Sequence, residues 1–128
     1  MAPPPRVKIC GVTRLEDALA AARLGADAIG FNFWPRSKRY LPPAAARALV
    51  SRLPPFVTAV GVFVDPTREE LLAAMATSGA QVAQLHGDEP PELLAGLPFP
   101  VVKAIRVGGP EALDQLGRYP AAAGFLLD

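Results

Sequence analysis

The stretch that decides the fold is VTAVGVFVDPTREELLAAMATSGAQVAQLH, residues 57–86. An apolar, valine-rich run is followed by a helical pattern and then by a second apolar run. Thr67 and Glu70 have the spacing of a capping box at the start of that helix. Two strands joined by a helix in this way form a βαβ unit, whose strands are parallel and whose crossover is right-handed. The stretch therefore predicts an α/β fold.

The same rhythm extends along the chain in both directions. We expect six strands, at residues 6–10, 28–33, 57–64, 81–86, 101–107 and 123–128. Five helices are expected between them, with starts marked by Thr13 together with Glu16, by Pro42 and Pro43, by the box at Thr67, by Asp88 and by Pro110. Gly25 is expected to stop the first of these helices.

Two architectures share this rhythm. Six strands complete a doubly wound sheet, whereas a (βα)8 barrel typically takes about 200 residues or more. Periodicity alone favours the doubly wound sheet. The sequence GFLLD, residues 124–128, stops as a strand finishes, which is unusual for a natural domain and favours an incomplete barrel.

Composition restricts the function. Hydrophobic residues make up 51% and charged residues 20% of the 128, which predicts a folded domain. Thirteen basic residues against twelve acidic ones give no argument for nucleic acid or an anionic membrane as partner. No apolar run approaches the roughly 18 residues of a membrane helix, and the first residues lack an apolar signal core. A single cysteine excludes an internal disulfide and suits the cytoplasm.

Reactive side chains gather where active sites form in both architectures, at the C-terminal ends of the strands. They are Cys10, Asn32, Asp65, His86, Arg106 and Asp128. No second His or Cys stands at metal-ligand spacing, and no glycine-rich nucleotide loop is present. We therefore expect neither a metal nor a cofactor.

Cys10 has two interpretations, a small buried hydrophobe or a reactive group. Strand alternation places Lys8 and Cys10 on one face and Val7 and Ile9 on the other. An apolar face suits the helix layer, so Lys8 and Cys10 are expected to face the interior, where a nearby ammonium favours the thiolate. Such a thiolate serves as a general base or as a nucleophile, and spacing does not choose between them.

Three further features each have more than one interpretation when only the sequence is considered. Asp128 is a general acid, a metal ligand or only a terminal carboxylate. The cationic segment WPRSKRY, residues 34–40, is a solvated loop or an anion clamp, and its isolation on a nearly neutral chain disfavours nucleic acid. His86, the lone histidine, is more often structural than catalytic in such a position.

Five motifs in order resemble the phosphoribosylanthranilate isomerase family. They are KICGVT at 8–13, GADAIGF at 25–31 with PRSKRY at 35–40, VGVFV at 60–64, QLHG at 84–87 and FLLD at 125–128. The resemblance covers residues 6–128 and implies a (βα)8 TIM barrel. We therefore expect residues 1–128 to be one partial barrel domain of about six parallel strands and five helices. Strands seven and eight, with their phosphate-binding loops, would be absent.

The resemblance also implies an activity. The family carries out the Amadori rearrangement of N-(5-phosphoribosyl)anthranilate to 1-(2-carboxyphenylamino)-1-deoxyribulose 5-phosphate in tryptophan biosynthesis, without metal or cofactor. Cys10 would be the general base that takes the proton from sugar C2, and Asp128 the general acid for the ring oxygen. Substrate binding would involve Arg39, holding the anthranilate carboxylate, with Lys8, His86 and Asn32 nearby.

Competing hypotheses accompany this one. A non-catalytic βα module that binds a small anion or a partner chain is the second. A doubly wound receiver or flavodoxin-like domain is the third, and it lacks the acidic or phosphate-binding loop expected after the first strand. Because the first and sixth strands would be open edges, we expect the chain to be weakly active at best. It would form a homodimer or a swapped assembly, or be a degraded form of a longer enzyme.

Overall fold

The computed structural model describes residues 1–128 and contains one six-stranded sheet in the order β1-β2-β3-β4-β5-β6. The strands are β1 (Lys8–Cys10), β2 (Ala28–Asn32), β3 (Thr58–Phe63), β4 (Val82–Leu85), β5 (Val101–Ile105) and β6 (Gly124–Leu127). All five neighbouring pairs are parallel. This sequential order is that of a barrel and not of a doubly wound sheet, in which the order reverses at a switch point. The prediction of an incomplete barrel with six parallel strands is confirmed.

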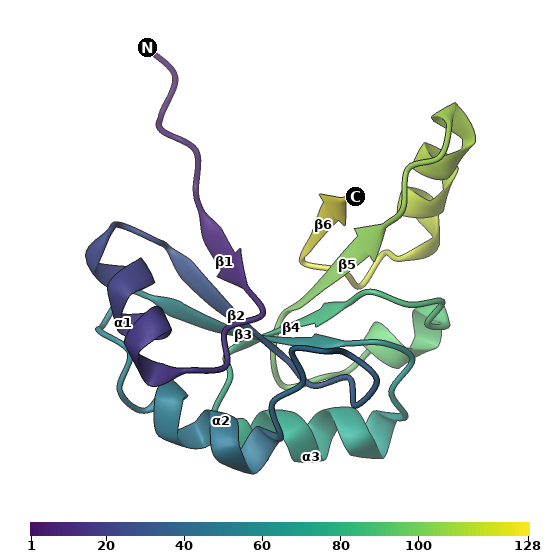
Figure 1. The fold of residues 1–128 in the computed structure, drawn as a ribbon. Coiled ribbons are helices and arrows are strands. Elements are labelled where there is room, and N and C mark those ends of the chain that lie inside the picture. The colour runs from purple at the N-terminus through teal and green to yellow at the C-terminus, as the bar shows by residue number, and fades with distance from the viewer.

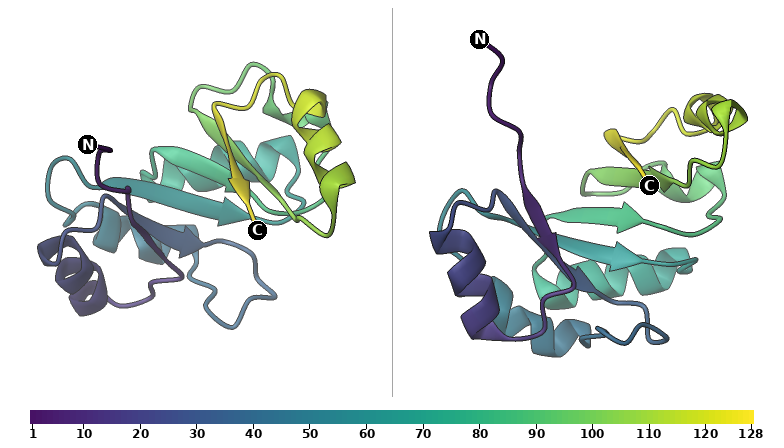
Figure 2. Two further views of the ribbon diagram at one scale, coloured as in Figure 1. Left: turned by 90° about the horizontal axis from the view of Figure 1, so that it is seen from above. Right: turned by 45° about the horizontal axis from the view of Figure 1, so that its top comes forward.

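The sheet is curved like a trough (Figure 1). Strands β2, β3 and β4 form its floor, β1 rises on one side, and β5 and β6 rise on the other, with the three α-helices outside. Further views show the same opening between β1 and β6, and the first residues extending away from the sheet (Figure 2). The two edge strands are therefore the ones that the sequence predicted to be open.

Five helical segments connect the strands. They are the α-helices α1 (Leu15–Arg23), α2 (Pro43–Val50) and α3 (Arg68–Ser78) and the 3-10 helices η1 (Pro91–Leu94) and η2 (Pro110–Arg118). The predicted number is correct, but the last two are not α-helices. Asp88 does not cap η1, because Pro90 precedes that segment and the Asp88 amide donates to Asp65 Oδ1 at 2.8 Å. No helix is long and apolar enough to cross a membrane.

Only one of the two predicted capping boxes forms. The Thr67 hydroxyl accepts from the Glu70 amide at 3.1 Å, and the Glu70 carboxylate accepts from the Thr67 amide at 3.0 Å. The prediction of a capping box at Thr13 is wrong, because the N-cap residue of α1 is Arg14 and no side chain caps the helix. Glu16 pairs instead with the Arg14 guanidinium.

The hydrophobic core lies between the outer face of the sheet and the helices. Its largest fully buried apolar side chains are Phe31, Ile29, Leu71, Leu85 and Ile105. Register places Ile9 beside Ile29 on this outer face and Cys10 beside Gly30 on the concave face. The predicted alternation is thus confirmed, although Ile9 is 42% exposed because β1 is an edge strand.

Candidate active site on the concave face

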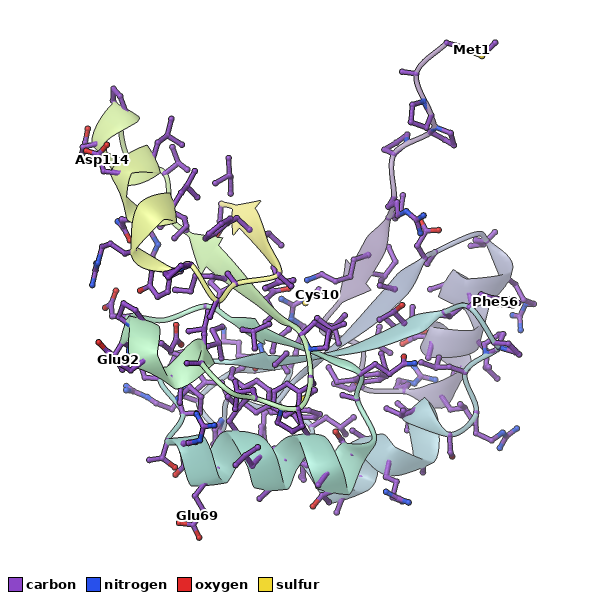
Figure 3. All side chains as sticks on the ribbon, turned by 180° about the vertical axis from the view of Figure 1, so that it is seen from behind. Met1, Cys10, Phe56, Glu69, Glu92 and Asp114 are labelled. Carbon is purple, nitrogen blue, oxygen red and sulfur yellow. The ribbon has the colours of Figure 1, made fainter.

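Cys10 ends β1 on the concave face. It pairs in register with Gly30, and a Cβ built on Gly30 would lie 2.9 Å from the Cys10 Sγ. The missing side chain at that position therefore leaves room for the thiol. Figure 3 shows Cys10 near the opening of the trough, between β1 and β6. The thiol is partly buried and has no disulfide partner.

Arg39 reaches back from the β2–α2 loop to the end of β1. Its Nη1 donates to the Cys10 carbonyl oxygen at 3.2 Å. Gly11 has a φ of 80°, and a Cβ there would lie 2.5 Å from the Arg39 Cζ. Glycine thus both supplies the left-handed backbone and lets the guanidinium lie against it. Arg39 is an exposed residue, and a guanidinium has further N–H donors that can bind an anion.

The rest of the basic loop has other contacts. The Arg36 guanidinium lies 5.9 Å from the centroid of the Trp34 ring, a cation–π distance. The Trp34 amide donates to Asn32 Oδ1 at 2.9 Å. Asn32, predicted to bind substrate, therefore holds the start of the loop with its side-chain oxygen. Within the loop, Arg39 is the cation that turns toward Cys10.

A chain of polar side chains crosses the concave face from β1 to β6. Lys8 Nζ donates to Gln84 Oε1, and Gln84 Nε2 lies 3.2 Å from His86 Nδ1. His86 Nε2 then lies 3.1 Å from Asp128 Oδ2. Four side chains from three strands are thus connected, three of them predicted site residues. Gln84 was missed, and its only signal in the sequence is its place two residues before His86 on the same face.

Asp128 is held by the backbone of β5. Its amide donates to the Ile105 carbonyl oxygen at 2.9 Å, and its own carbonyl oxygen accepts from the Val107 amide at 2.7 Å. Alternation along β6 puts Asp128 on the concave face with Leu126. The carboxyl side chain is 57% exposed, so one oxygen meets His86 while the group remains open to solvent.

Lys8 does not contact the thiol directly. The hydrogen bond of its ammonium goes to Gln84, although the side chain shares the concave face with Cys10 as expected. The cation that donates to the Cys10 backbone is that of Arg39. Lys8 therefore approaches the concave face from the strand and Arg39 from the loop, with the hydrogen bond of Arg39 made to the Cys10 backbone.

A buried ion pair organises the neighbouring loops. Lys103 Nζ lies 3.1 Å from Glu89 Oε1, and the two side chains are 3% and 0% exposed. Glu89 Oε2 accepts from the amides of Asp65 at 2.8 Å and Gly87 at 2.9 Å, so the pair joins the loops after β3 and β4. The Tyr119 hydroxyl donates to the Glu89 carbonyl oxygen at 2.8 Å, and burial raises the pKa of Tyr119 above its ordinary value. The sequence analysis did not predict this ion pair. Its one signal in the sequence is that Lys103 stands inside the apolar run VVKAI, residues 101–105.

A cavity of about 460 Å³ opens beside His86 at the same edge of the sheet. Arg106 from the end of β5 and Arg118 from η2 line it, together with Asp65. Neither Cys10 nor Asp128 lines this cavity, and His86, which contacts Asp128, connects it to the carboxyl. No group of three or more His, Cys, Asp or Glu side chains is placed to hold a metal ion.

Comparison with known proteins decides the family. The sequence profile of N-(5'phosphoribosyl)anthranilate (PRA) isomerase matches residues 7–128. The chain belongs to this family. One relative is the N-(5'-phosphoribosyl)anthranilate isomerase of Nitrosospira multiformis. It is 50% identical to this chain over 124 residues, which are 96% of the chain and 60% of the relative. The chain thus spans about 60% of the length of the curated relatives that it matches.

Solved structures agree in fold. The phosphoribosyl anthranilate isomerase of Thermus thermophilus has a TM-score of 0.90 and 52% identity, over 97% of this chain and 62% of that chain. The enzyme of Thermotoga maritima has a TM-score of 0.92 and 43% identity, over 98% of this chain and 62% of that chain. A further structure of a phosphoribosyl anthranilate isomerase, also with a TM-score of 0.92, contains reduced 1-(o-carboxyphenylamino)-1-deoxyribulose 5-phosphate.

Proposed function

We propose that the concave face belongs to an isomerase that converts N-(5-phosphoribosyl)anthranilate to 1-(2-carboxyphenylamino)-1-deoxyribulose 5-phosphate in tryptophan biosynthesis. One observation carries the proposal. A thiol and a carboxyl end the two edge strands of a trough, and a hydrogen-bonded chain of side chains connects those strands across its interior. Family membership over residues 7–128 supports the same activity.

The two groups divide the proton transfers. Asp128 gives a proton to the furanose ring oxygen as the ring opens to a Schiff base. Cys10, as thiolate, then removes the proton from sugar C2 to form an enolamine, which tautomerises to the ketone. The strand ends hold both groups on one face, which supports their acting on a single sugar ring.

The substrate's anionic ends need separate partners. Arg39, beside Cys10, binds the anthranilate carboxylate with its free guanidinium donors. Lys8 contributes positive charge and holds Gln84, His86 contacts the acid, and Asn32 keeps the Arg39 loop folded. The phosphate would be bound by loops of strands seven and eight, which lie outside residues 1–128, so these residues are one partial barrel domain.

A chimera tests the proposal. Residues 1–128 are joined to the part of the Nitrosospira multiformis relative that lies beyond the match, and conversion of N-(5-phosphoribosyl)anthranilate is followed by its fluorescence. Cys10→Ser and Asp128→Asn are each expected to lower kcat by roughly 10²–10⁴-fold, the usual range for losing a general acid or base. Arg39→Met should raise KM, whereas Arg36→Met in the same loop should change neither constant, because Arg36 stacks on Trp34.

The alternative predicts a different result. A non-catalytic module that binds a small anion or a partner chain would give a folded chimera without turnover, and the Cys10 and Asp128 variants would then be indistinguishable from the parent. That outcome would reject the isomerase.

We also propose that the 128-residue chain by itself assembles through its edge strands, as a homodimer or a swapped assembly. The outer side chains of these strands are exposed apolar groups, with Ile9 at 42%, Phe125 at 38% and Leu127 at 57%. Sedimentation should give a mass above that of the monomer, and Phe125→Lys should shift it toward the monomer. A parent that sediments as a stable monomer would contradict this proposal. A cytoplasmic location stays a prediction.

A further inference from the structure

The side-chain amide of Gln84 has a fixed orientation. Gln84 is 3% exposed on the concave face of β4, and its Oε1 accepts a hydrogen bond from Lys8 Nζ. An ammonium group only donates hydrogen bonds, so the oxygen and not the NH2 group of the amide must face Lys8. The amide nitrogen is thereby directed to the other neighbour, His86 Nδ1, at 3.2 Å.

This orientation selects one tautomer of His86. The NH2 group of Gln84 only donates, so His86 Nδ1 must be the acceptor and carries no proton. The ring proton of the neutral imidazole is then on Nε2, which faces Asp128 Oδ2 at 3.1 Å and donates to it. A protonated Nδ1 would direct an N–H group at the N–H groups of the amide, and the hydrogen bond between Gln84 and His86 would be lost.

We infer that Gln84 is a positioning residue, which acts through His86 to set where Asp128 holds its proton. Because Oδ2 accepts the His86 N–H, the proton of the neutral carboxylic acid is on Oδ1, the oxygen that does not contact His86. This inference rests on the proposed role of Asp128 as the general acid. When the Oδ1–H bond breaks, the proton goes to the ring oxygen, the electron pair stays on the carboxylate, and the His86 N–H stabilises that charge.

The other tautomer would work against the acid. With the proton on Nδ1, the lone pair of Nε2 would face Asp128 and accept the proton that the substrate needs. Gln84 and Lys8 therefore prevent the histidine from competing with the ring oxygen. Gln84 lies two positions before His86 on the same strand face, whereas Lys8 lies 76 positions from Gln84 and meets it across the curved sheet.

Nitrogen-15 NMR of the imidazole tests the tautomer. The chain has a single histidine, so every imidazole signal belongs to His86. Above the ordinary titration range of imidazole, the parent should show a protonated Nε2 and an unprotonated Nδ1. Gln84→Glu presents only acceptors to the ring and should shift the Nδ1 signal to the protonated position. Gln81→Glu is the matched control, because Gln81 is exposed and uses only its oxygen, which accepts from the Ala59 amide at 2.9 Å.

Turnover of the chimera gives the second readout. Gln84→Glu should lower kcat roughly 10- to 100-fold with little change in KM, the cost of misdirecting a positioned group. Gln84→Met serves if Gln84→Glu unfolds, and it should give a mixture of tautomers. A parent with a protonated Nδ1, or a Gln84 variant that changes tautomer with unaltered kcat, would overturn the inference. If the chimera shows no turnover while His86 in the 128-residue chain keeps its proton on Nε2, the isomerase is rejected and the tautomer is not.

Discussion

Gly11→Ala separates backbone strain from the placement of Arg39. Gly11 has a φ of 80°, which costs an alanine about 1–2 kcal/mol, offset by about 0.4–1 kcal/mol from the stiffer unfolded chain. The new Cβ would also lie 2.5 Å from Arg39 Cζ. The guanidinium ends a flexible side chain and moves away at little cost, so the net loss of folding stability should be about 0–1.6 kcal/mol.

Binding should change more than stability. A displaced Arg39 no longer meets the anthranilate carboxylate, and hydrogen bonds to a charged group contribute about 1.5–3 kcal/mol. At about 1.4 kcal/mol per tenfold, affinity for reduced 1-(o-carboxyphenylamino)-1-deoxyribulose 5-phosphate should fall roughly 10- to 150-fold. Calorimetric titration of the chimera measures that affinity, and urea unfolding of the same samples measures stability.

Gly79→Ala is the matched control. Gly79 has a φ of 79°, but its Cβ would meet only Val50 Cγ1, at an ordinary 3.6 Å. The two variants should lose similar stability, and only Gly11→Ala should lose affinity. Equal affinities in the parent and both variants would refute the role given to Gly11 and Arg39.

Three further predictions concern the surroundings of the site. Gly30→Ala places a Cβ 2.9 Å from the thiol that ends β1, so it should cost about 1–3 kcal/mol and change the alkylation rate of the single cysteine, followed by mass spectrometry. Lys103→Met leaves the Glu89 carboxylate buried without its charged partner, so urea unfolding should show a loss of about 3–5 kcal/mol in folding stability. Adding Glu89→Gln should recover part of that loss, and a loss below about 1 kcal/mol for Lys103→Met would contradict the buried pair. Thr67→Ala removes a formed capping box and should cost about 1 kcal/mol in urea unfolding, whereas Thr13→Ala, where no box forms, should stay within about 0.5 kcal/mol; equal losses would refute the distinction.

Local patterns were enough to predict the strands and their faces. The apolar runs set the positions of all six strands within a few residues, and alternation in KIC placed Lys8 and Cys10 on the interior face before any register was known. Resemblance selected the barrel where periodicity favoured the doubly wound sheet. Both successes rest on information carried by neighbouring residues or by whole motifs.

The failures have a common physical cause. Thr13 and Glu16 have the spacing of a capping box, but Arg14 competes for the Glu16 carboxylate and the helix begins later. Contacts made by the fold are equally invisible in a local pattern. Lys8 and Gln84 lie 76 positions apart and meet only because the sheet curves. The partner of a buried polar group cannot be read from sequence spacing when the two residues belong to different strands.

The position of the Asp128 carboxyl depends more on the register between β5 and β6 than on the residues next to Asp128 in the sequence. Asp128 lies on the concave face because Leu127 pairs with Ile105, and Ile105 and Val107 bind the two sides of the Asp128 backbone. A shift of β6 by one residue would turn the carboxyl to the outer face and bring the apolar side chain of Leu127 toward His86. The hydrogen bond from His86 Nε2 and the two backbone bonds oppose that shift together. The contact that directs the proton of Asp128 therefore also helps to hold the strand that carries it.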